Sequence, residues 1–241
     1  MLLLYQFDKF KLGLEIPNLA SPNQEFVDKF QILNFSMSSV VSPEINEIDK
    51  IFTLKQVHGN EVVSIENNKI LFKEKIYDFS YSLSGTIEAD AIVTVDRGIK
   101  VGIRSADCAP IMFFGNGVVG GIHGGWRGLK EGIIENTINF VRKKYGFEPQ
   151  KALYFLLPCI HSCCYEVGEE FLEWAKNFCL IRGGKVYFDI PKFVLSKLLE
   201  LEASEENIYY SPLCTKCNSE FLPSYRSTKT EDRIEAFIYL T

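Results

Sequence analysis

The chain has 241 residues, of which 46% are hydrophobic, and its 26 basic and 31 acidic side chains give a net charge of −5. This size suits one large domain or two small ones. No basic block stands out, which argues against nucleic acid as a partner. No apolar run approaches the roughly 20 residues that span a bilayer, and the start MLLLYQF lacks the features of a signal peptide. We therefore expect a soluble cytoplasmic protein without a membrane partner.

The first fifty residues carry the weakest pattern. Residues 51–66 predict two short strands that are broken at the sequence HGN. Residues 67–86 look like a polar surface excursion dotted with aromatic side chains. Two β-branched runs within residues 89–108 flank the sequence DRG and predict a hairpin.

A second hairpin is predicted where IMFF and VVGGI flank the turn sequence GNG at 115–117, and His123 ends its second strand. The apolar spacing becomes helical from Leu129 to Tyr145. Further helices are predicted at 168–178 and at 191–203, the latter with a proline in its first turn. Short strands are predicted at 153–157, 186–190, 207–210 and 233–240. Because strands and helices mix without a βαβ rhythm, we expect a single α/β (α+β) domain with mixed sheets and flanking helices.

Three residues of metal-ligating types each follow a strand-like run and begin a glycine- or proline-containing turn: His58, Cys108 and His123. Two imidazoles and one thiolate suit zinc with a fourth position open, where a bound water has a pKa of about 7. A plainer alternative is a buried structural histidine and a small apolar cysteine. Another alternative makes Cys108 a nucleophile with His123 as its base, and Asp107 would then orient a histidine.

Two arginines are candidates for holding an anion. Arg127 lies in HGGWRG, where glycines let the backbone approach a ligand and a helix start offers N–H groups. Arg226 follows Tyr225 and precedes small polar residues, which suits a phosphate or a ribose. For both arginines the alternative is an ion pair on the surface.

The chain has seven cysteines, an odd number that argues against a secreted disulfide scaffold. His161 lies among Cys159, Cys163 and Cys164, and CTKC at 214–217 could complete a cysteine-rich zinc site. Because no second CxxC accompanies CTKC, we expect buried or incidental thiols here and no second metal ion.

Five motifs in order resemble the YfiH family. They are KQVHG (55–59), SADCAP (105–110), HGGWRGL (123–129), CCYEVGEE (163–170) and CT…SYR (214–226), and the family carries KQVHG, TADC-P, HAGWRG, YEVG and CT…SYRR. The family is described as laccase-like multicopper polyphenol oxidoreductases and also as purine nucleoside phosphorylases with adenosine deaminase activity. Its fold is related to that of a deamidase toxin that uses a Cys–His pair.

The resemblance implies site residues. The zinc ligands of the family fall on His58, Cys108 and His123. Catalytic roles are implied for Asp107, Cys108 and His123, and binding of nucleoside or phosphate for Gln56, Arg127, Tyr165 and Arg226.

The resemblance also implies a function, which is zinc-dependent phosphorolysis of adenosine, inosine, guanosine and methylthioadenosine, together with hydrolytic deamination of adenosine. The implied partners are a purine nucleoside and phosphate, and a homodimer is left open. Copper-dependent phenol oxidation is the alternative, but three histidines are too few for several coppers. A cysteine hydrolase using Cys108 and His123, and a regulatory protein that kept the metal and lost activity, are further alternatives.

The chain departs from the family at both ends. Residues 1–50 lack the TRxGGVS and SLNLG patterns, and FSMSSV at 35–40 is at best a remnant, so we expect a single domain over 1–241 with a divergent part at 1–50. At the C-terminal end the sequence keeps Tyr225, Arg226 and Arg233 and loses the glycines of the family motif.

Overall fold

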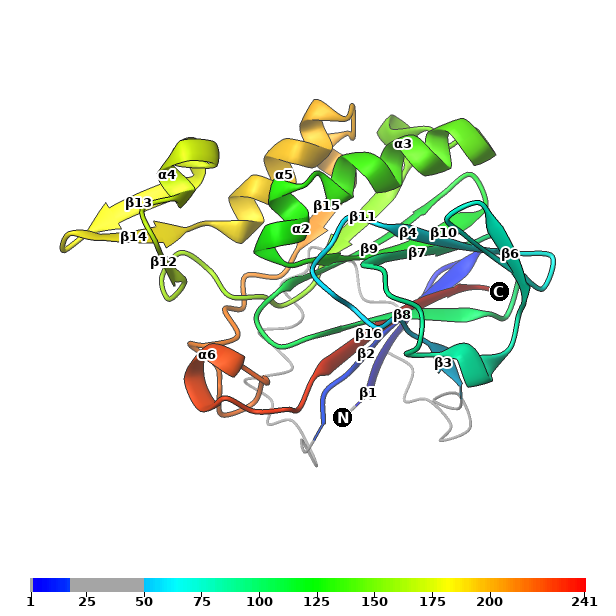
Figure 1. Cartoon of the computed structure of the whole chain (residues 1–241), viewed down its shortest axis with the longest axis horizontal. Helices are drawn as coiled ribbons and strands as arrows, with labels where there is room; N and C mark the ends of the chain where they lie inside the picture. The colour runs from blue at the N-terminus through cyan, green and yellow to red at the C-terminus, as the bar shows by residue number, and fades with distance from the viewer. Residues whose placement is uncertain (1, 18–49) are drawn as a thin grey trace.

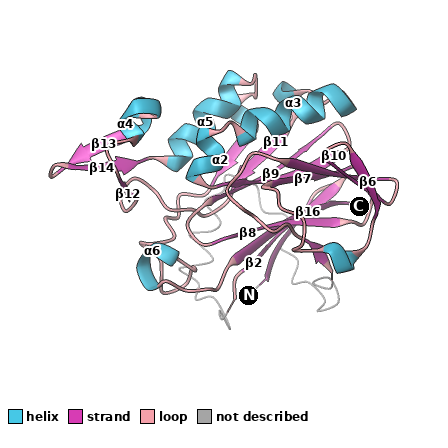
Figure 2. Cartoon of the chain, in the orientation of Figure 1, coloured by secondary structure: helices cyan, strands magenta, loops and turns pink. Residues whose placement is uncertain are grey.

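The computed structural model describes residues 2–17 and 50–241. Two sheets lie face to face, and helices cover the outer face of the larger one (Figure 1). The smaller sheet has the strand order β1-β2-β16-β8-β3, and the larger has β15-β11-β9-β10-β7-β4-β5-β6. A third sheet, β12-β14-β13, projects with a short helix beyond the main body (Figures 1 and 2). This arrangement confirms the predicted mixed α/β fold.

The bounds of the elements are as follows. The smaller sheet is built from β1 (Leu2–Gln6), β2 (Phe10–Glu15), β3 (Ile51–Phe52), β8 (Lys100–Ser105) and β16 (Ile234–Leu240). The larger sheet is built from β4 (Val62–Glu66), β5 (Lys69–Phe72), β6 (Lys75–Asp78), β7 (Ala91–Thr94), β9 (Ala109–Gly115), β10 (Val118–Gly124), β11 (Leu153–Leu156) and β15 (Ile208–Tyr210). The projecting sheet has β12 (Glu166–Val167), β13 (Cys179–Arg182) and β14 (Lys185–Phe188). The α-helices are α2 (Trp126–Lys130), α3 (Ile133–Tyr145), α4 (Phe171–Trp174), α5 (Ile190–Glu200) and α6 (Tyr225–Thr228), and short 3₁₀ turns lie at Tyr81–Leu83, Pro149–Lys151, Lys176–Phe178 and Glu205–Asn207.

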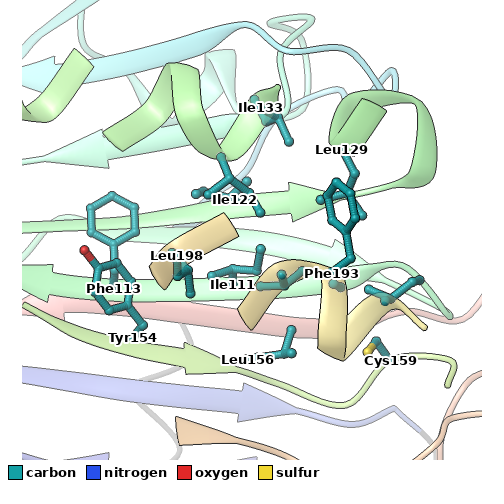
Figure 3. Packing of buried hydrophobic residues seen from close by; sticks show 14 of the residues in the cluster. Ile111, Phe113, Ile122, Leu129, Ile133, Tyr154, Leu156, Cys159, Phe193 and Leu198 are labelled. Carbon is teal, nitrogen blue, oxygen red and sulfur yellow. The ribbon is translucent and has the colours of Figure 1, made fainter. Parts of the chain in front are cut away.

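The central strands of the larger sheet are buried on both faces, which explains their continuous apolar runs. On β9, Ile111 and Phe113 belong to the cluster beneath the helices, whereas Met112 belongs to the cluster between the sheets. This alternation follows from the two-residue period of a strand. Helices α3 and α5 complete the first cluster, part of which is seen in Figure 3. None of the helices in these described ranges is long and apolar enough to cross a membrane.

Several local predictions are confirmed. β9 and β10 form the predicted antiparallel hairpin around the GNG turn. β3 and β4 flank the HGN break, and β11, β14, β15 and β16 occupy the four predicted strand positions. α5 begins one residue earlier than predicted, since Asp189 caps it by accepting a hydrogen bond from the Lys192 N–H.

Other predictions were wrong. The runs around DRG do not pair as a hairpin, because β7 joins the larger sheet and β8 the smaller one. The excursion at 67–86 contains β5 and β6, which extend the edge of the larger sheet. The long helix from Leu129 starts earlier, at Trp126, and is interrupted at Gly132, whose φ is +81°. The helix at 168–178 is only one α-helical turn and one 3₁₀ turn.

The sequence analysis also missed β1, β2, β12 and β13. The motif remnant FSMSSV lies outside the described residues. The extent of the domain, residues 1–241 with a divergent part at 1–50, stays a prediction.

Two neighbouring leucines on α5 provide a test of this packing. Leu198 belongs to the cluster beneath the helices (Figure 3). Its exposed fraction is 1%, whereas that of Leu199 is 39%. We expect Leu198→Ala to lower the free energy of unfolding by about 2–5 kcal/mol, because it removes buried contacts and leaves a cavity. Leu199→Ala is the matched control, with an expected loss of roughly 0.5 kcal/mol or less. Urea denaturation followed by circular dichroism measures both, and equal losses would contradict the assigned packing.

Candidate functional site

The candidate site forms where two connections of the chain each pass from the smaller sheet to the larger one. His58 lies on the connection from β3 to β4, and Cys108 lies on the connection from β8 to β9. His123 is near the end of β10, opposite Pro110 of β9. The crossings bring residues from distant parts of the chain to one point, which is why sequence spacing alone gave no metal motif.

The three predicted metal ligands meet in space. One ligand atom from each of His58, Cys108 and His123 lies within 4.8 Å of the others. Cys108 Sγ is 3.7 Å from His58 Nε2, and the two imidazole rings lie edge to face at 4.8 Å between centroids. His123 is buried, and the other two residues are half-buried. These three side chains could hold a metal ion.

A buried carboxylate that the sequence analysis missed organises this cluster. Asp90 is 0% exposed, and its Oδ1 lies 2.8 Å from His123 Nδ1. The same carboxylate accepts hydrogen bonds from the backbone N–H groups of Val57, His58 and Gly59 at 3.2, 2.9 and 2.7 Å. With Nδ1 engaged, Nε2 of His123 is left for a ligand, as in metal sites with a carboxylate behind the histidine. The available signal was an aspartate inside the apolar run ADAIV.

Charge coupling within the cluster favours a thiolate. Burial alone would raise the pKa of Cys108, but His123 and His58 beside it lower that pKa to about 6. Burial would likewise lower the pKa of His123, but Cys108 and Asp90 raise it to about 9. The pKa of Asp90 is lowered, because hydrogen bonds from His123 and the Gly59 N–H outweigh the effect of burial. A thiolate is the form of cysteine that binds metals and attacks carbon.

The glycines of HGGWRG make room for the loop that carries His58. A Cβ atom on Gly125 would lie 2.4 Å from His58 Cδ2, and one on Gly128 would lie 2.5 Å from the carbonyl oxygen of Gly59. Both distances are below any normal contact, so these positions exclude larger residues. The glycines therefore serve the close approach of two chain segments.

A cavity of about 740 Å³ opens onto the cluster. Its lining includes four cationic side chains, those of Lys55, Arg104, Arg226 and Arg233. Aromatic side chains of Trp126, Tyr165 and Tyr225, the carboxylates of Asp107 and Glu231, and the three candidate ligands also line it, as do Thr53, Leu54, Gln56, Gly85, Ser105, Ala106, Ile160 and Ile190. The cavity can thus receive a ligand that has both a flat apolar part and an anionic part.

Asp107 is a buried residue of the cavity lining, and its carboxylate connects two other segments of the chain. One oxygen accepts a hydrogen bond from the Thr215 hydroxyl at 2.6 Å, and the other accepts one from the Arg226 N–H at 2.7 Å. Its φ is +95°, which is unusual for a residue with a side chain. Such strain persists only where the surroundings hold it, and here the hydrogen bonds from Thr215 and Arg226 hold the Asp107 side chain in place.

The remaining predicted residues differ in their positions. Tyr165 lines the cavity, with the Arg226 guanidinium 5.1 Å from the centre of its ring. Gln56 also lines it, but its amide is engaged with the backbone N–H and C=O of Arg104 at 2.8 and 2.7 Å. Arg127 is exposed, stacks on Trp126 at 4.5 Å and is not among the residues that line the cavity. The structure therefore does not bring Arg127 into this site.

Comparison with known proteins decides the family. The family described as multi-copper polyphenol oxidoreductase laccase matches residues 37–241 of this chain. The chain belongs to this laccase-like family, the YfiH family. A purine nucleoside phosphorylase of Aquifex aeolicus is 38% identical over 187 residues, which cover 73% of this chain and 87% of that protein. The purine nucleoside phosphorylase YfiH of Escherichia coli is 30% identical over 196 residues, 78% of this chain and 72% of that protein.

Two solved structures share the fold of this chain. YlmD of Geobacillus stearothermophilus matches with a TM-score of 0.72 at 20% identity, covering 97% of this chain and 93% of that one. The hypothetical protein YfiH of Bacillus licheniformis matches with a TM-score of 0.72 at 19% identity, covering 96% and 93%.

The close approach at Gly125 yields a test of the cluster. We expect Gly125→Ala to push the His58 ring away and to lower metal affinity by on the order of tenfold, the scale of losses when support for a ligand is removed. The control is Gly59→Ala in the same loop, where an added Cβ would meet its nearest atom at an ordinary 3.6 Å. Metal content after dialysis against a graded chelator series measures both variants. Equal retention in the two variants would show that His58 does not depend on this contact.

Proposed function

We propose that this chain is a metal-dependent purine nucleoside phosphorylase that also deaminates adenosine, with zinc as its metal. The observation that carries the proposal is the cavity in which the His58, Cys108 and His123 cluster adjoins cationic and aromatic side chains. Relatives named purine nucleoside phosphorylase support it. The substrate set we propose is adenosine, inosine, guanosine and methylthioadenosine, each with phosphate.

The donor set fits zinc. Zinc bonds of about 2.0–2.3 Å in a tetrahedron place neighbouring ligand atoms about 3.3–3.8 Å apart. The 3.7 Å between Cys108 Sγ and His58 Nε2 falls in this range. Three protein ligands leave one position free, which is typical of catalytic rather than structural zinc. An ion held there would supply Lewis-acid chemistry or activate a water molecule.

Phosphorolysis requires an anion close to the sugar. An oxygen of hydrogen phosphate forms a bond to C1′ while the bond from C1′ to the base breaks. The base keeps the electron pair and takes up the proton that the phosphate gives up. Arg226 is our candidate for holding phosphate, since it lines the cavity and is fixed by Asp107 through its N–H and by the Glu166 carbonyl at 3.1 Å. Fixed cations placed where negative charge gathers lower a barrier without reorganisation. Asp107 has a positioning role in this scheme.

The aromatic side chains suit the base. Trp126 and Tyr165 line the same cavity, and stacking on an aromatic ring is worth about 1–3 kcal/mol per base. Deamination at C6 of adenosine is the second activity we propose, because nucleobase deaminases use a metal with histidine and cysteine ligands. The same donor types occur here in one cavity.

Two other functions make different predictions. Oxidation by several coppers needs more imidazoles than a chain with three histidines can supply, and only two of them are in the cluster. A cysteine hydrolase is favoured by the Asp90–His123 pair beside Cys108, which resembles a nucleophile, base and orienting carboxylate. Such a hydrolase would keep its activity in a chelator, whereas the proposed enzyme would lose it and regain it with zinc.

Cys108→Ala tests the metal and the activity together. Removing a ligand should cost more than the roughly 10–100-fold typical of outer-shell changes, so we expect phosphate-dependent base release to fall by at least about a hundredfold. One equivalent of zinc per chain should be lost with it. Cys179→Ala, at a cysteine outside the cluster and the cavity, is the control that should keep both. Full zinc content in Cys108→Ala would overturn the ligand assignment, and phenol oxidation by the copper-loaded wild type would favour the oxidase.

Arg226→Lys tests the anion site. Lysine keeps the charge and loses the planar fork, so we expect the KM for phosphate to rise by about tenfold or more. Adenosine deamination, which needs no phosphate, should suffer less, and zinc content should stay unchanged. Arg127→Lys is the matched control, since Arg127 is exposed outside the cavity lining, and its two activities should stay near the wild type. A larger loss of phosphate-dependent activity in Arg127→Lys than in Arg226→Lys would instead assign phosphate binding to the HGGWRG segment.

A further inference from the structure

A second cluster of metal-ligating side chains lies apart from the candidate ligands in the cavity. The sulfur atoms of Cys163, Cys164, Cys214 and Cys217 all lie within 4.8 Å of one another. Cys217 Sγ is 3.5 Å from Cys163 Sγ and 3.3 Å from Cys164 Sγ. All four are free thiols. We refer to them as the four-cysteine cluster.

We propose that the four-cysteine cluster binds one structural zinc ion. Four thiolates at about 2.3 Å from a tetrahedral zinc lie about 3.8 Å from one another, close to the separations of this cluster. A four-sulfur tetrahedral set selects zinc or iron. All four positions are filled by protein, so the ion is closed to substrate and its role is structural.

The backbone holds the two halves of the cluster together without the metal. Strands β11 and β15 pair in parallel, and beyond them Thr215 N–H donates to the Cys159 carbonyl at 3.0 Å. The CTKC turn is closed by Asn218, whose side-chain amide donates to the Cys214 carbonyl at 2.8 Å. The backbone N–H of His161 donates to Cys214 Sγ at 3.5 Å. The site is therefore largely preformed.

The sequence expectation of incidental thiols rested on the lack of a second CxxC. The structure supplies the missing pair from the adjacent residues Cys163 and Cys164. His161 and Cys159, which share that stretch of sequence, are outside the group of four. Two adjacent cysteines can both face one ion here because a turn reverses the chain, with the Cys164 N–H and the Tyr165 N–H both donating to the His161 carbonyl at 2.9 Å.

Zinc at this position would also fix part of the cavity. Thr215, inside the CTKC turn, donates its hydroxyl to Asp107 at 2.6 Å, and Tyr165 follows Cys164 directly. Asp107 in turn holds the Arg226 backbone. This consequence for activity rests on the proposed function, but zinc binding by the four cysteines does not.

Elemental analysis of the full chain tests the proposal. We expect about two zinc per chain in the wild type, about one in Cys217→Ser and about one in Cys108→Ala, since each site needs all its thiolate ligands. Cys179→Ser is the matched control and should keep both. Replacing zinc by cobalt in Cys108→Ala should give the absorption of a purely sulfur-ligated tetrahedral ion. Iron in place of zinc, or unchanged zinc in Cys217→Ser, would overturn the proposal.

A second measurement covers the case in which Cys217→Ser does not fold. In the wild type, alkylation followed by peptide mass spectrometry should find the four cysteines protected, and a chelator should expose them together, while Cys179 reacts at an unchanged rate. Alkylation of the cluster before chelation, or recovery of its cysteines as disulfides, would contradict the zinc site. Absence of phosphorolysis with two zinc per chain would refute the proposed function alone.

Discussion

The carboxylate of Asp90 is the constraint on which the candidate site depends. It is fully buried, and a buried charge is tolerated only where hydrogen bonds replace water. Three backbone N–H groups of the loop at 57–59 and the imidazole of His123 provide those bonds. Its own carbonyl also accepts the His123 N–H at 2.7 Å. One side chain therefore fixes both histidines of the cluster relative to each other, and it holds His58 at a positive φ of 62°.

The glycines of HGGWRG are the steric counterpart of this electrostatic constraint. Asp90 binds the backbone of the loop that carries His58, and Gly125 and Gly128 leave the space that this loop occupies. Neither feature alone would position His58. The hydrogen bonds to Asp90 require the loop to lie close to HGGWRG, and the space left by the glycines is filled only because Asp90 binds the loop. The motifs KQVHG and HGGWRG thus form the two sides of one contact between chain segments, and each motif depends on the other for the position of its histidine.

The sequence predicted what depends on local pattern. The hairpin of β9 and β10 follows from apolar runs around a GNG turn, and α5 was predicted with a proline in its first turn. The sequence could not predict which sheet a strand joins, because β7 and β8 are placed in different sheets by pairing partners that lie far away along the chain. Residue type and position after strand-like runs nominated the three candidate metal ligands, and the family resemblance strengthened that prediction. Asp90 was missed because a single acidic residue beside a strand shows no partner in sequence.

The two groups of candidate metal ligands differ in the number of coordination positions that they fill, and that difference separates the roles we propose for them. His58, Cys108 and His123 face a cavity with one coordination position to spare, whereas the four-cysteine cluster offers a complete set of soft ligands. The two groups are linked through Asp107. Its carboxylate accepts a hydrogen bond from the Thr215 hydroxyl in the CTKC turn, and it lies next to Cys108 on the connection from β8 to β9. A metal site with all its positions filled by protein is suited to holding the CTKC turn rigid. The positive φ of Asp107 is maintained only where its surroundings are rigid. The rigidity of one group would thereby serve the chemistry of the other.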